Sequence, residues 1–138
     1  MSVRPVGATV GSVTLGLAGA FTAGAGIAGI VLTSTVDFAA FGPFAAFVNL
    51  AVPYAYGAAA ILATIGIVTM IVANNLYAGR SYVAGLVLSG LLALTGVAAI
   101  LFGGRLPISG LGDIASGLGG LCFLPLVMLL LGAPYYRR

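Results

Sequence analysis

The sequence contains no histidine, lysine or glutamate, and its acidic residues number only two. A histidine-ligated haem is therefore excluded, and nucleophilic catalysis lacks its usual base. Proton- or ion-coupled transporters normally carry ionisable groups at membrane depth, so that function class is also a poor match. In particular, the chain does not fit the small four-helix multidrug transporters, which depend on a membrane-embedded glutamate.

Cysteine and clustered basic residues are equally scarce. Cys122 is the only cysteine, so no internal disulfide can form, and one thiol with two distant carboxylates does not make a metal site. Nucleic-acid binding requires basic residues grouped on one face, whereas only Arg137 and Arg138 are contiguous. Gly103-Gly104 is not followed by a lysine and a hydroxyl residue, so a phosphate-binding loop is not predicted. We expect no cofactor, no metal and no nucleic-acid partner.

Apolar residues dominate what is present. The 138 residues are 62% hydrophobic and 5% charged, whereas soluble domains carry about 25% charged residues. The mean hydropathy is +1.25. Between Ala8 and Pro134 the charged residues are Asp37, Arg80, Arg105 and Asp113. This composition predicts an integral membrane protein.

Four membrane-spanning helices fit the length, because each needs about 20 apolar residues. We predict an all-α compact bundle forming one transmembrane domain over residues 1–138, with spans at residues 8–32, 53–73, 82–102 and 114–131. Arg4 and the small residues Ala18-Gly19-Ala20 resemble a signal peptide. The apolar run continues well past Ala20, so we expect a retained first span. Pro125 is expected to kink the last span rather than end it, since neighbouring helices can satisfy the freed carbonyl.

The segment of residues 38–52 is apolar but interrupted by Gly42-Pro43 and Asn49. Prolines disfavour helical conformation in the preceding residue, so Pro43 and Pro53 are natural break points. We predict a separate segment that lies on the membrane surface or enters it as a re-entrant piece. The alternative is that it forms the outer end of a long, kinked second span.

Arginine positions predict the orientation. With both termini inside, Arg4, Arg80, Arg137 and Arg138 lie at cytoplasmic edges, and Arg105 lies outside with both acids. Such an excess of basic residues in short loops marks the cytoplasmic side. We therefore expect a multi-pass protein of the cell membrane with cytoplasmic termini, although a virion or organelle membrane would suit the same composition.

Small residues recur at four-residue intervals along the predicted spans. The first span carries Ala8, Ser12, Gly16, Ala20, Gly24 and Ala28, and the third carries Gly85, Ser89 and Ala93. In lipid, close backbone approach supplies much of the association between helices. We predict that these rows are helix–helix contacts, within the bundle or with another protein. The alternative is chance, because the chain holds 22 glycines.

Asp37, Arg105 and Asp113 all lie at the predicted outer edge. One interpretation is a polar cluster that binds an ion or partner, or that fixes two loops together. The other is ordinary solvated loop charges, whose pairing contributes about 0–1 kcal/mol.

These patterns predict a non-enzymatic structural or accessory membrane protein. We expect its partners to be membrane lipids and either further copies of itself or other membrane subunits. The alternative function is a passive channel or facilitator for a small solute or ion, since a hydroxyl-lined pore needs no titratable residue. Arginine without lysine, with abundant Ala, Gly and Val, indicates a GC-rich prokaryotic or viral gene.

Overall fold

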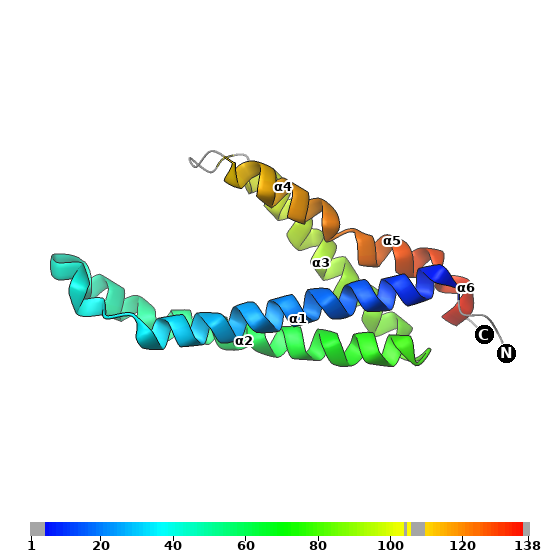
Figure 1. Ribbon diagram of the computed structural model, residues 1–138, viewed down its shortest axis with the longest axis horizontal. Coiled ribbons are helices and arrows are strands. Elements are labelled where there is room, and N and C mark those ends of the chain that lie inside the picture. The colour runs from blue at the N-terminus through cyan, green and yellow to red at the C-terminus, as the bar shows by residue number, and fades with distance from the viewer. Residues whose placement is uncertain (1–4, 104, 106–109, 137–138) are drawn as a thin grey trace. The chain divides into compact units, whose positions relative to one another are not determined.

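Helices account for most of the residues that the structure describes. The computed structural model describes residues 5–103, 105 and 110–136. Its elements are α1 (Val6–Thr35), η1 (Phe38–Phe44), α2 (Ala45–Tyr77), α3 (Tyr82–Gly103), α4 (Leu111–Leu121), α5 (Leu124–Leu131) and α6 (Ala133–Tyr136) (Figure 1). Within the described part of the chain, four helical stretches are long and apolar enough to cross a membrane: Val6–Thr35, Ala39–Tyr77, Tyr82–Gly103 and Gly112–Leu131. The prediction of an all-helical chain with four membrane-length helices is confirmed.

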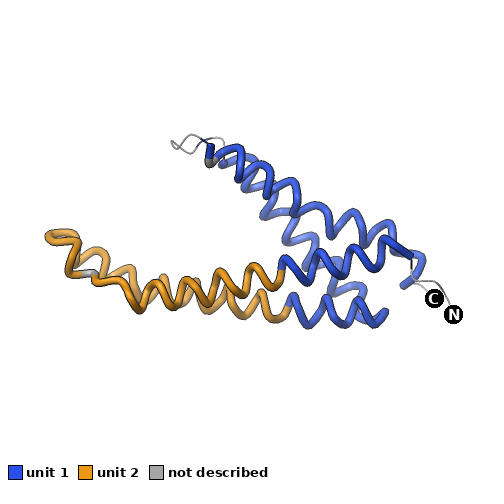
Figure 2. Tube along the Cα trace, viewed as in Figure 1, with its two compact units in different colours: residues 1–18, 69–138 blue, residues 19–68 orange. Residues whose placement is uncertain are grey.

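The chain divides into two compact units (Figure 2). Unit 1 comprises Met1–Ala18 and Thr69–Arg138, and unit 2 comprises Gly19–Val68. Unit 2 thus contains the second half of α1, η1 and most of α2.

Unit 2 is an antiparallel helical hairpin whose two backbones approach closely. A Cβ atom added to Gly26 would collide with the backbone of Ala63 and Ala59. On the facing helix, one added to Gly66 would collide with the backbone of Ala23. The hairpin is therefore built on positions where no side chain separates the helices, as expected for association in an apolar medium.

In unit 1, α3 and α4 lie side by side and also meet through glycine (Figure 1). A Cβ atom added to Gly96 would lie 2.5 Å from the carbonyl oxygen of Gly119. In return, one added to Gly119 would lie 2.7 Å from the carbonyl oxygen of Gly96. This reciprocal contact leaves no room for a methyl group on either helix.

Large side chains fill the rest of unit 1. Its core consists of Leu15 from α1, Ala73 and Leu76 from α2, and Leu129 from α5. Leu76 occupies the space left by the missing side chain of Gly85 on α3. Three helices other than α3 thus contribute leucines to one cluster, which is closed on the fourth side by a glycine.

The segment of residues 38–52 divides between two elements. Residues 38–44 form η1, which is broken at Gly42, where the backbone has φ 56° and ψ −126°. Residues 45–52 are instead the first turns of α2, which continues through Pro53. Pro43 therefore marks a break and Pro53 does not, so the alternative interpretation holds for the second half of the segment.

The last span bends without ending at Pro125. Between α4 and α5, Cys122 and Phe123 keep right-handed helical backbone angles. The Phe123 N–H donates to the carbonyl oxygen of Gly120 at 3.2 Å, a tighter helical turn. Pro125 lies in the first turn of α5, where its missing N–H costs little.

Candidate functional site

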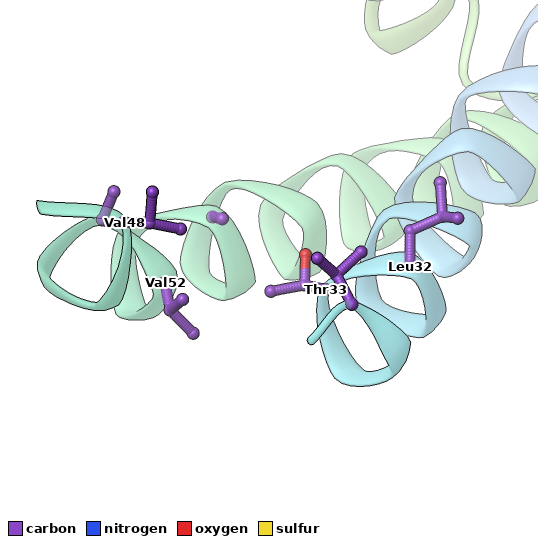
Figure 3. Close-up of a pocket in the computed structure, with 7 residues that line it drawn as sticks. Leu32, Thr33, Val48 and Val52 are labelled. Carbon is purple, nitrogen blue, oxygen red and sulfur yellow. The ribbon is translucent and has the colours of Figure 1, made fainter. Parts of the chain in front are cut away.

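An apolar groove lies between the last turns of α1 and the first turns of α2 in unit 2. Figure 3 shows Leu32 and Thr33 on one side, with Val48 and Val52 on the other. Val36, Ala51 and Ala55 complete the lining, and the groove has a volume of about 260 Å³. Its one side-chain hydroxyl, on Thr33, donates to the carbonyl oxygen of Gly29 at 2.7 Å. The groove therefore suits hydrocarbon rather than a polar ligand.

A second hollow, of about 300 Å³, lies in unit 1 between the first turns of α1 and the last turns of α2. Its lining is Ser12, Val13, Gly16, Leu17, Met70, Ala73, Asn74 and Tyr77. The Ser12 hydroxyl donates to the Thr9 carbonyl oxygen at 2.9 Å, so it is already satisfied. The hollow lacks charged side chains, and it offers no acid or base for chemistry.

Four hydroxyl groups within the long apolar helices bond to their own helices. Thr14, Thr64 and Thr95 each donate to the carbonyl oxygen four residues earlier, at 2.7, 2.8 and 3.0 Å. Ser89 donates to the carbonyl oxygen of Leu86 at 3.0 Å. Such local bonds satisfy a hydroxyl in lipid without a partner helix.

The row of small residues on α1 does not stay on one buried face of the helix. Ser12 is buried and Gly16 is half-buried, whereas Ala20, Gly24 and Ala28 are exposed. A step of four residues advances about 40° around a helix with 3.6 residues per turn. A six-member row therefore winds about halfway round α1, away from the helices that its first members contact.

The contacts within unit 2 follow a different spacing, which the sequence reasoning missed. Gly19, Ala23 and Gly26 are the buried small residues of α1 here, at steps of four and three. Ala59 and Gly66 are buried on α2, with the half-buried Ala63 between them at the same steps. Alternating steps of four and three average close to 3.6 and so keep one face toward a partner. This alternation is visible in the sequence and was the signal that could have identified the contact face.

The row on the third span is enclosed by unit 1. Gly85, Ser89 and Ala93 on α3 are all buried, and Ser89 is fully so. Gly85 contacts Leu76 of α2, while Gly96 and Gly103 continue the buried face toward α4.

The predicted polar cluster is distributed over both units. Asp37, in unit 2, caps η1 by accepting a 3.0 Å hydrogen bond from the Ala39 N–H. In unit 1, the guanidinium carbon of Arg105 lies 5.8 Å from the centre of the Phe102 ring, a cation–π distance. Asp113 is exposed in the first turn of α4, where a carboxylate complements the helix dipole. That Asp37, Arg105 and Asp113 form one cluster stays a prediction.

One end of unit 1 collects several chain segments. Gly7 and Ala8 at the start of α1 contact Gly132 after α5, and a Cβ atom added to Gly79 of the α2–α3 turn would lie 3.7 Å from Tyr135 of α6. The Arg80 turn is therefore close to both terminal helices. Arg4, Arg137 and Arg138 themselves lie outside the described residues.

Among the residues that the structure describes, no group of three His, Cys, Asp or Glu side chains is placed to hold a metal. No protein-family model, curated protein or solved structure matches the chain.

Proposed function

We propose that this chain is a non-enzymatic, multi-pass membrane protein with a structural or accessory role. It associates with further copies of itself or with other membrane subunits through an uncovered face of α1. We define this face by Ala20, Gly24 and Ala28. Its lipid setting is supported by the four membrane-length apolar helices and by the many bulky apolar side chains on the surface, such as Leu94 at 66% exposed.

Gly24 is the residue of this face that best suits close contact with another helix. It is exposed, and no atom outside its own helix backbone lies within 4 Å of an added Cβ. Glycine in a helix costs about 1 kcal/mol relative to alanine. That cost is offset where the missing side chain lets a second helix approach, as Gly26 already does on the other face. The uncovered face is thus suited to a further helix.

Both termini are proposed to be cytoplasmic in a cell membrane. The support is the excess of arginines at one set of edges, together with the meeting of α1, α5 and the α2–α3 turn at one end of unit 1.

The test is the mass of the intact assembly after gentle purification into mild detergent and into lipid nanodiscs. We expect a discrete oligomer or a defined complex with another membrane protein. Gly24→Leu should weaken the assembly by at least about tenfold, equivalent to about 1.4 kcal/mol, while helicity is retained. Only monomer for the unchanged chain in both media would refute the proposal.

Gly117→Leu is the matched control. Gly117 is also exposed, with nothing within 4 Å of an added Cβ, and it lies on α4 outside the uncovered face of α1. The same substitution should leave the assembly intact. Equal losses for Gly24→Leu and Gly117→Leu would mean that bulk alone, rather than this face, causes the effect.

A passive channel or facilitator is the competing function. Its support is weaker, because Thr14, Thr64, Ser89 and Thr95 direct their hydroxyls to their own helices. Solute flux above that of empty liposomes, carried by the monomer, would favour this function over the structural one.

A further inference from the structure

The hairpin tip, defined as residues 36–54, is apolar, although the length of α2 places it outside the hydrocarbon layer of a bilayer. α2 has 33 residues. At about 1.5 Å per residue it is about 50 Å long, against about 30 Å of hydrocarbon and about 40–45 Å of whole bilayer. Even a tilt of about 40°, the upper end of the usual range, leaves about 38 Å along the membrane normal. One end of α2 must therefore leave the hydrocarbon.

The polar end of α2 indicates which residues lie outside the hydrocarbon. Asn74 and Asn75 precede the turn that carries Arg80, so this end is anchored at water. About 20 residues of span counted back from Asn74 reach Tyr54. Tyrosine is enriched at the headgroup level, which agrees with a boundary at this position. The turns of α2 before Tyr54, and η1 with them, then lie at headgroup depth.

Bulky apolar side chains protrude from this segment, and other parts of the chain leave them exposed. The exposed fractions are 50% for Phe41, 66% for Phe44, 75% for Phe47, 72% for Leu50 and 78% for Tyr54. These residues recur at steps of three or four. Exposure of a phenylalanine or leucine to water forfeits about 1.5–3 kcal/mol each, so a free loop in water is disfavoured.

The chemistry of the tip selects lipid as its partner rather than another helix. Tight helix pairs in this chain use glycine and alanine, whereas protruding phenylalanines keep a second backbone at a distance. The tip carries no basic residue, and its one charge, Asp37, is engaged in capping η1. The adjoining groove between Val36 and Val48 has an apolar lining and is open to its surroundings, so an acyl chain can fill it.

We infer that the hairpin tip is a lipid anchor that lies at the boundary between headgroups and acyl chains. Phe41, Phe44 and Phe47 lie at this boundary, and Asp37 stays at the aqueous edge. Gly42 permits this arrangement because its positive φ, followed by Pro43, turns the chain out of the helical path between α1 and α2. This inference depends on the proposed membrane setting, but not on oligomer formation.

The absence of tryptophan from the chain provides a direct test. Phe47→Trp and, separately, Phe44→Trp each place one fluorophore in the tip, with a second position available should one variant fold poorly. Each is reconstituted into phosphatidylcholine vesicles whose acyl chains carry bromine at a shallow or at a deep position. We expect blue-shifted emission and a greater loss of emission with shallow than with deep bromine.

Leu94→Trp is the depth control, because Leu94 is exposed near the middle of α3 and should be quenched most by deep bromine. Three results for the tip would overturn the inference. Quenching by aqueous acrylamide but not by bromine would mean a loop in water. Protection from both quenchers would mean burial against protein, and preferential quenching by deep bromine would mean a re-entrant segment.

Native mass measured on the same samples separates this inference from the proposed assembly. A monomer with shallow quenching would keep the lipid anchor and refute association. An oligomer whose tip is protected from lipid would keep association and refute the anchor.

Discussion

The hairpin of unit 2 and the core of unit 1 are held together by opposite means. In the hairpin, Gly26 and Gly66 bring two backbones together with no side chain between them. In unit 1, fully buried Leu15, Leu76 and Leu129 interdigitate between helices. The contact positions of the hairpin are therefore sensitive to added atoms, and the leucine core of unit 1 is sensitive to atoms removed.

Tyrosine side chains reinforce the second region through contacts between helices. Tyr82 donates a hydrogen bond to the carbonyl oxygen of Leu129, and Tyr136 donates one to that of Leu76, both at 3.2 Å. The two tyrosine rings stack with centres 4.7 Å apart. These side chains join α2, α3, α5 and α6 within unit 1, whereas the described hairpin contacts depend on small residues at the right spacing.

Adding bulk to the hairpin should have the largest effect. Gly66→Leu places a side chain where the backbone of Ala23 lies, and a backbone cannot move aside as a side chain can. We expect the free energy of unfolding to fall by more than about 4 kcal/mol, beyond most single substitutions. Titration with sodium dodecyl sulfate, followed by circular dichroism, measures the change.

Gly57→Leu is the control on the same helix, because nothing lies within 4 Å of an added Cβ there. It should be neutral or slightly stabilising, since leucine is the better helix former. Similar losses for Gly57→Leu and Gly66→Leu would show that the two backbones are not in close contact.

Removing bulk from the core should come next. Leu129→Ala deletes a fully buried side chain and leaves a cavity in unit 1. We expect a loss of about 3 kcal/mol in the same titration. Leu130→Ala, at a neighbouring position that is 55% exposed, should cost much less. No difference between the two variants would mean that Leu129 is not enclosed.

Removing a hydroxyl should have the smallest effect. Tyr136→Phe keeps the ring stacked on Tyr82 and deletes the hydrogen bond to the Leu76 carbonyl oxygen. A loss of about 1 kcal/mol is expected. Tyr54→Phe serves for comparison, because Tyr54 is 78% exposed on α2 and should change stability less. A larger loss at Tyr54 would mean that the hydrogen bond from Tyr136 to the Leu76 carbonyl oxygen does not stabilise the fold.

Much of the fold was predictable because it depends on composition and local signals. The number of long apolar helices follows from the scarcity of charge, and the start of α3 at Tyr82 follows from the polar turn before it. The bend before Pro125 follows from the missing N–H of proline. The continuation of α2 through Pro53 was less accessible, because an interior proline is tolerated where the surroundings satisfy the freed carbonyl.

The candidate sites were less predictable, because they depend on which faces meet. A four-residue row on α1 is visible in the sequence, but its winding sends Ser12 into unit 1 and leaves Gly24 uncovered. The groove beside Val36 and Val48 has no signature of its own in the sequence, since its lining comes from the ends of two helices.

The sequence by itself determined the long apolar helices and most of their ends, because hydropathy and turn residues act over a few neighbouring positions. Only the tertiary structure decided that Gly26 and Gly66 are the close-contact positions and that Gly24 is not. All three are glycines in helices with similar neighbours. They differ in the angle at which each faces the partner helix, and that angle is set by the packing of the whole hairpin.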